Sequence, residues 1–77
     1  MARLNTPSYI ERYKRFLLRL REARLKAGMT QEQVATSLGR PQSFVSKCES
    51  GERRVDFVEA QDFAELYGIA LDRLGDV

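Results

Sequence analysis

Glycines divide this chain into short helical segments, and that division constrains the fold more than any other feature. Gly28, Gly39, Gly51 and Gly68 each follow a segment with apolar residues at helical spacing, as residues that end helices do. No segment alternates apolar and polar residues over the length of a strand, and no Asn-Gly or Asp-Gly hairpin signal is present. The sequence therefore predicts an all-α fold.

Three capping boxes indicate where helices begin. In this pattern a Ser, Thr or Asp caps the first turn, and a Glu or Gln three residues later bonds back to it. The pairs are Ser8 with Glu11, Thr30 with Gln33, and Asp56 with Glu59. Pro41 can start a further helix, since a proline in the first turn costs no hydrogen bond. With a short final turn or helix that includes Ile69, Leu71 and Leu74, we expect five helices, and we expect residues 1–7 and 75–77 to be frayed.

Length and composition exclude several classes of function. The 77 residues fit one small domain over 1–77, which is too small for a large enzyme cleft between two lobes. The sequence has no histidine and one cysteine, Cys48, so a histidine triad and an internal disulfide are impossible. We expect no enzymatic activity, no metal and no cofactor. There is no apolar run of membrane-spanning length and no signal-peptide core, so the expected location is the cytoplasm.

Charge is unevenly distributed along the chain. Residues 1–27 carry eight Lys or Arg and two Glu, a net charge of +6. Residues 55–77 carry six acidic residues and Arg73, a net charge of −5, within a total of +2. The basic end can face a polyanion. The same charges also suit the solvated face of an amphipathic helix, so charge alone leaves both interpretations open.

The segment from Thr30 to Gly51 carries the clearest functional signal. Two short helices are expected here, joined at Gly39, which tolerates the positive φ of a tight turn. Ala35 is small where the helices would cross, and Val45 is apolar where the second helix would anchor. These features predict a helix-turn-helix over residues 31–50, a motif whose second helix, here 41–50, enters the major groove of DNA.

The outward face of this second helix is polar and carries no acid. Its residues are Gln42, Ser43, Ser46, Lys47 and Ser50. A helix that lies on DNA avoids carboxylates because they repel phosphates, whereas an ordinary surface helix mixes both signs of charge. Glu49 is the exception, and we expect its side chain to point inward.

The run GMTQEQVATSLGRPQSFVSKCESGERRVD resembles the Xre/Cro/phage-434-repressor class of helix-turn-helix regulators. The positions that match without insertion are Arg24, Gly28, Thr30, Gln31, Val34, Ala35, Leu38, Gly39, Val45, Ser46, Glu49 and Gly51. The resemblance covers about residues 18–74. It implies a compact five-helix bundle of the lambda-repressor-like type, here with an extended first helix. It also implies a transcriptional regulator, here a repressor, that binds double-stranded DNA as a homodimer on an inverted-repeat operator.

The resemblance further implies roles for individual residues. Base contacts would come from Gln42, Ser43 and Lys47, because Gln can pair with adenine and Lys with guanine in the major groove. Phosphate contacts would come from Gln31, Arg40, Ser46, Ser50, Arg53 and Arg54. Arg24 and Glu49 would form a structural ion pair between the first and third helices. The candidates for a dimer interface are Ile69, Ala70, Leu71 and Leu74.

Some positions depart from the older phage members of this class. Phe44 and Cys48 replace other residue types. Phe44 either covers the edge of the core, which we favour, or packs on a deoxyribose. We expect Cys48 to be a small buried core residue rather than a redox sensor. The long first helix adds apolar surface at Tyr9, Tyr13, Phe16 and Leu17, which either packs on its own domain or forms a subunit interface.

Other functions suit the same domain. An antitoxin of a toxin–antitoxin pair would repress its own promoter and bind a toxin through the long first helix. A restriction–modification controller protein is also a small dimer of this fold. A protein-interaction module without DNA binding is less well supported by the residues. No membrane contact and no small-molecule ligand are expected.

Overall fold

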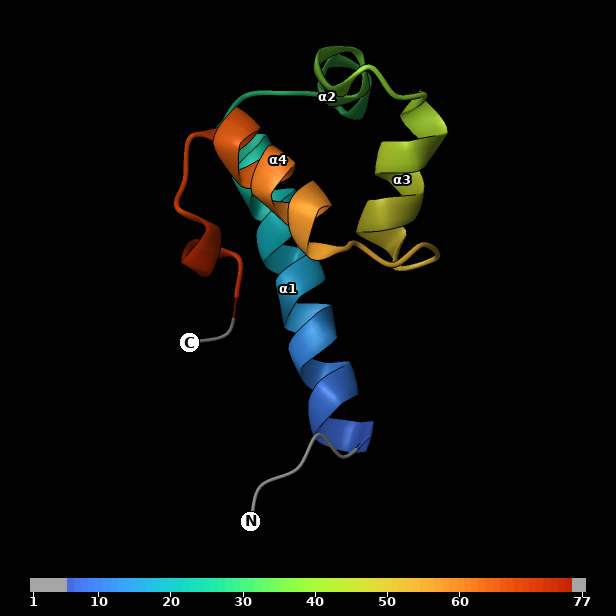
Figure 1. The fold of residues 1–77 in the computed structure, drawn as a ribbon, viewed down its shortest axis with the longest axis vertical. Coiled ribbons are helices and arrows are strands. Elements are labelled where there is room, and N and C mark those ends of the chain that lie inside the picture. The colour runs from blue at the N-terminus through green and yellow to red at the C-terminus, as the bar shows by residue number, and fades with distance from the viewer. Residues whose placement is uncertain (1–5, 76–77) are drawn as a thin grey trace.

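The computed structural model describes residues 6–75, which form four α-helices and one turn of 3-10 helix (Figure 1). The elements are α1 (Thr6–Lys26), α2 (Gln31–Leu38), α3 (Gln42–Ser50), α4 (Phe57–Tyr67) and η1 (Leu71–Arg73). Over the described part of the chain there is no strand, as the sequence predicts. Residues 1–5 and 76–77, part of the ends expected to fray, lie outside the described residues, whereas Thr6 and Pro7 belong to α1.

The predicted capping boxes form at α2 and α4. The Gln33 backbone N–H donates to Thr30 Oγ1 at 3.1 Å, and the Thr30 N–H donates to Gln33 Oε1 at 2.9 Å. At α4 the Glu59 N–H donates to Asp56 Oδ1 at 2.8 Å, and the Asp56 N–H donates to Glu59 Oε1 at 3.1 Å. Each box satisfies donors that a helix start leaves without intrahelical partners.

Two predicted helix starts are wrong by one or two residues. The first helix begins at Thr6, so Ser8 lies inside its first turn and does not cap it. A proline is compatible with a first helical turn, which allows Pro7 to stand inside the helix. The third helix begins at Gln42, because Pro41 has an extended ψ of 154° and acts as the N-cap.

The chain between Gly68 and Gly75 does not form the predicted fifth α-helix. The Ile69 N–H closes the end of α4 by donating to the Ala64 carbonyl at 3.0 Å, and Ala70 is extended with ψ of 146°. A helix can therefore start only at Leu71. The residues from Leu71 form one 3-10 turn, in which the Leu74 N–H donates to the Leu71 carbonyl at 3.0 Å. The observed bundle has four α-helices over residues 6–75.

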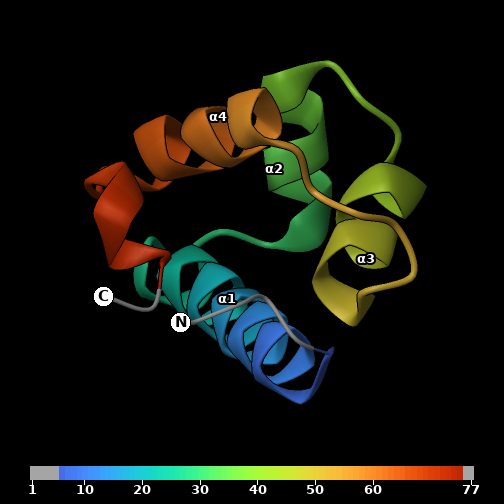
Figure 2. The ribbon, with the colours of Figure 1, turned by 60° about the horizontal axis from the view of Figure 1, so that its bottom comes forward.

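The helices surround a common centre, seen from a second direction in Figure 2. The largest side chains that fill this centre are Leu20, Val34, Val45, Cys48, Phe63 and Leu74. Phe63 of α4 stacks on Phe44 of α3 and on Tyr67, with ring centroids 6.1 and 6.0 Å apart. Burying each of these large apolar side chains stabilises the fold by about 1.5–3 kcal/mol.

The N-terminal half of α1 extends beyond the other helices (Figure 1). No helix among residues 6–75 combines the length and the hydropathy of a membrane span.

Candidate nucleic-acid interface

α3 buries one face and presents the other to solvent. Phe44, Val45 and Cys48 are buried. The exposed residues are Gln42, Ser43, Ser46, Lys47 and Ser50, the same set that the sequence places outward. The Ser50 hydroxyl donates to the Lys47 carbonyl at 3.2 Å, so it also ties down the last turn of the helix. The outward face of α3 is thus polar, free of acid and open to solvent.

The turn before α3 is fixed by the backbone of α2. Gly39 caps α2 with φ of +68°, a left-handed conformation that disfavours residues with a Cβ. The Arg40 N–H then donates to the Ala35 carbonyl at 2.9 Å. Ala35 itself is buried in the core, and α2 packs against α3. The left-handed glycine therefore forms the tight turn between the two helices that the helix-turn-helix prediction requires.

An ion pair between Arg24 and Glu49 anchors α3 to α1. Arg24 Nε donates to Glu49 Oε2 at 2.7 Å, and Nη2 donates to Oε1 at 3.1 Å. Only 9% and 5% of the two side chains are exposed. The Glu49 hydrogen bond raises the pKa of Arg24 despite the opposing effect of burial. Glu49 therefore points inward, and the pair implied by the family resemblance is present.

Gln31 takes part in the same network. Its Nε2 donates to Glu49 Oε1 at 3.1 Å, and its side chain is half-buried. Arg24 Nη1 also donates to the Met29 carbonyl at 2.9 Å. The start of α2 is therefore tied to α3 and α1 through one carboxylate. In this structure the Gln31 amide nitrogen donates to Glu49. The phosphate contact of Gln31 stays a prediction.

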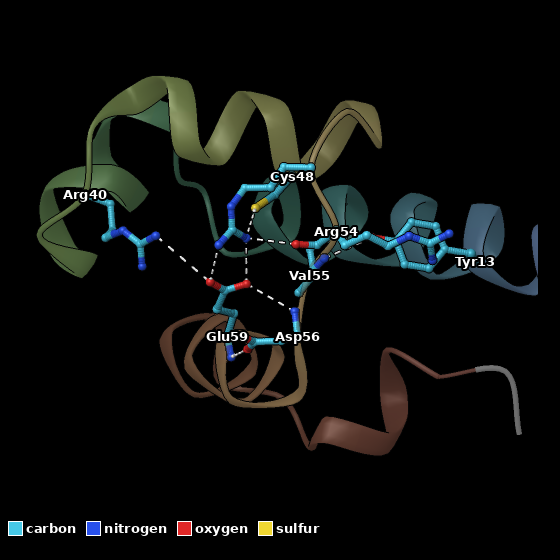
Figure 3. Close-up of polar contacts among 8 residues, drawn as sticks. Tyr13, Arg40, Cys48, Arg54, Val55, Asp56 and Glu59 are labelled. Carbon is cyan, nitrogen blue, oxygen red and sulfur yellow. Dashed lines mark hydrogen bonds and ion pairs between the residues drawn. The ribbon is translucent and has the colours of Figure 1, made fainter.

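A second cluster surrounds the Phe44 ring at the other side of α3. The guanidinium carbons of Arg40 and Arg53 lie over this ring, 3.8 and 4.9 Å from its centroid. Arg53 Nη1 and Nη2 donate to the two carboxylate oxygens of Glu59 at 2.7 and 2.8 Å. Figure 3 shows Glu59 reaching from α4 toward Arg40 and Cys48. Hydrogen bonding from Arg53 lowers the pKa of Glu59, so this carboxyl stays ionised in mildly acidic solution.

Phe44 and Cys48 are core residues, as the sequence indicates. Phe44 packs between the arginine cluster and Phe63, and Cys48 is fully buried. Burial raises the pKa of the Cys48 thiol, although the nearby Arg53 opposes the shift. A buried, protonated thiol is unreactive.

Arg54 is held by the extended part of α1. Its guanidinium carbon lies 5.0 Å from the Tyr9 ring centroid and 4.7 Å from that of Tyr13, and its Nη1 donates to the Tyr9 hydroxyl. The Val55 N–H donates to the Tyr13 hydroxyl at 3.1 Å (Figure 3). The extra length of α1 therefore packs on its own domain and contacts the loop that follows α3.

The predicted dimer-interface residues are mostly turned inward. Leu74 is 1% exposed and belongs to the core, so it offers little surface to a second copy, and its place in a subunit contact stays a prediction. Ile69 and Leu71 are partly buried against the same core, and Ala70 is exposed. Large exposed apolar side chains lie elsewhere in the described chain. They are Tyr9, Ile10, Leu18, Leu25, Phe57 and Val58.

Sequence reasoning missed the second role of Glu59. Its position predicts the capping box of α4, but nothing in the pattern indicates that the same carboxylate also binds Arg53. The tyrosine contacts of Arg54 were missed for a similar reason, because they join residues more than 40 positions apart.

Comparisons with known proteins agree with this geometry. A family model described as a helix-turn-helix domain matches residues 15–75. A solved structure, an XRE-family like protein from Pseudomonas syringae pv. tomato str. DC3000, is 47% identical and superposes with a TM-score of 0.83. The match covers 88% of this chain and 83% of that chain. No significant match is found among curated proteins. The chain therefore belongs to the helix-turn-helix family of XRE-like proteins, and it is a DNA-binding regulator.

Proposed function

We propose that this protein is a sequence-specific, dimeric transcriptional repressor that reads an inverted-repeat operator with α3 in the major groove. The observation that carries the proposal is the exposed, acid-free face of α3 on a helix fixed from behind by Arg24 and Glu49. A rigid helix with short polar side chains can approach base edges closely, and no carboxylate on that face repels the phosphates.

Base readout comes from the first two turns of α3. Gln42 and Ser43 stand at its exposed N-terminal end, and Lys47 follows one turn later on the same face. The N-terminal residues of a recognition helix are the ones that reach base edges in this docking geometry. Gln42 suits adenine through its amide, and Lys47 suits the guanine O6 and N7 acceptors.

Phosphate contacts lie around the edge of this face. The proposed residues are Gln31, Arg40, Ser46, Ser50, Arg53 and Arg54. Gln31 stands at the start of α2, where helix N–H groups also favour an anion. These contacts carry no sequence information, but they set the register of α3 and make binding sensitive to salt.

Dimerisation follows from size. A single small domain buries only about 600–1,000 Å² on DNA, which is little for tight specific binding. Two copies on half-sites about 34 Å apart would present two α3 helices to one side of the duplex. Ala70, with the half-buried Ile69 and Leu71 beside it, remains the candidate region for the contact between copies. Light scattering of the protein with and without DNA measures this association.

Selection of bound duplexes from a random pool tests the proposed function. We expect an enriched motif with two inverted half-sites whose centres lie one helical turn apart, about 10–10.5 base pairs. An enriched single half-site would remove the dimer from the proposal. A pool with no enrichment, from protein shown to be folded, would contradict sequence-specific binding.

A second candidate is the antitoxin of a toxin–antitoxin pair. The observation that favours it is the outer face of α1, where Leu18 and Leu25 are exposed at a spacing of seven residues. Such a pair lies on one side of a helix and can dock against an apolar partner. Co-expression with a neighbouring gene product tests it, and Leu18→Ser with Leu25→Ser would abolish the complex without affecting duplex binding.

A further inference from the structure

Glu59 joins two arginines that stand at opposite ends of the recognition helix. Arg40 lies in the turn before α3, and Arg53 lies in the loop after it. Arg53 binds both carboxylate oxygens of Glu59, and Arg40 Nη2 lies 4.0 Å from Glu59 Oε2. One carboxylate on α4 therefore holds both cations that flank α3.

The arginines are held but not buried. The side chains of Arg40 and Arg53 are 42% and 39% exposed, whereas that of Glu59 is 13% exposed. Arg53 Nη1 also donates to the Arg54 carbonyl at 2.8 Å, so its fork is directed toward the protein. A DNA phosphate can reach these guanidiniums from solvent, but a close contact with the fork of Arg53 requires that Arg53 leave Glu59.

We propose that Glu59 limits the affinity for DNA by competing with phosphates for Arg53 and Arg40. The inference rests on the proposed function, in which both arginines are phosphate contacts. Exchanging Glu59 for a phosphate breaks charge-assisted hydrogen bonds, and this cost is recovered only where a phosphate is held at the right position. A duplex that seats α3 fully in the groove provides that position, whereas a loosely bound random duplex does not. The operator complex therefore bears the cost of breaking these hydrogen bonds, whereas a random complex leaves them intact, so Glu59 lowers operator affinity more than random affinity.

Glu59→Gln is the variant that isolates this competition. Glutamine at this position still accepts the Asp56 N–H and so preserves the capping box of α4. Its amide lacks the charge that pairs with Arg53. The matched control is Glu65→Gln, which removes one negative charge from an exposed position of the same helix. Affinities for operator and random duplexes are measured over a salt series at a temperature where circular dichroism shows all proteins folded.

The expected result for Glu59→Gln is a several-fold gain in affinity for operator duplex, a smaller gain for random duplex, and therefore a larger operator-to-random ratio. The dependence of log affinity on log salt for random duplex should steepen by about 0.9 for each guanidinium that reaches a phosphate. Adding Arg53→Ala to Glu59→Gln should remove most of this gain.

Two results would overturn the inference. One is a Glu59→Gln protein whose ratio and salt slope equal those of Glu65→Gln. The other is weaker binding to every duplex with a flatter salt slope, which would mean that Glu59 presents the arginines to phosphates. Failure of the proposed function itself is distinguishable, because then the unsubstituted protein would bind neither duplex in a salt-dependent way.

Discussion

Two arginine–glutamate pairs have the same chemistry in different surroundings: one joins α1 to α3, and the other joins the loop after α3 to α4. The Arg24–Glu49 pair is almost wholly buried, and Glu49 also accepts from Gln31. In the Arg53–Glu59 pair the arginine is more than a third exposed. Breaking a buried pair leaves an unpaired charge in the protein interior, whereas an exposed cation can bind another anion that approaches from solvent. We infer that the first pair fixes the helix and that the second can change partners when DNA binds.

The largest expected effect is on the buried pair. Glu49→Ala leaves the Arg24 guanidinium buried without its counter-charge, and breaking such a pair costs about 3–5 kcal/mol. Urea unfolding monitored by circular dichroism measures the loss. Glu52→Ala, at an exposed position just after α3, is the control and should change stability little. A loss for Glu49→Ala no larger than that of the control would show that the buried pair does not anchor α3.

Substitutions on the outward face of α3 should affect recognition and leave stability intact. Lys47→Ala and Gln42→Ala should each cost about 1–3 kcal/mol of discrimination at the base pair they contact. Competition between operator and single-base variants measures this effect. If both variants still distinguish the operator from single-base variants as well as the unsubstituted protein does, these residues do not contact bases. The claim that α3 reads the DNA sequence would then lose its support.

Arg53→Ala should weaken operator binding by removing the contact between Arg53 and a phosphate. The salt dependence of operator binding should flatten by about 0.9, as expected when one phosphate contact is lost. Titrations at several salt concentrations measure the slope. A slope identical to that of the unsubstituted protein would mean that Arg53 stays with Glu59 in the complex.

The smallest expected effect is on stability in acid. Because pairing with Arg53 lowers the pKa of Glu59 in the folded state, this group stabilises the fold above its unfolded pKa. That contribution is lost as the pH falls through the lower, folded pKa. Glu59→Gln should therefore narrow the stability difference between neutral and acidic solution. Denaturation midpoints across this range measure it, and an unaltered pH profile would argue against a persistent pair in solution.

The features that the sequence predicts well are local. The Thr30 and Asp56 boxes and the turn at Gly39 depend on residues a few positions apart, and all three form as expected. The outward face of α3 follows from helical spacing in the same way. The family resemblance supplied the long-range contact between Arg24 and Glu49, which spacing alone does not reveal.

The features that the sequence predicts poorly depend on tertiary packing. Whether the last segment forms an α-helix depends on the Ile69 N–H, which is used to close α4. The burial of Leu74 depends on how that segment folds back onto the core. The contacts of Arg53 and Arg54 depend on which side chains the fold brings beside them, and charge pattern gives no partner for either.

Amide chemical shifts of the isotope-labelled protein, recorded with and without the selected duplex, test the central claim most directly. The account predicts the largest changes at the exposed residues of α3, from Gln42 to Ser50, with small changes for the buried part of α1 around Arg24. Chemical-shift changes that are concentrated on α4 and the outer side of α1, with α3 unaffected, would contradict DNA binding through α3.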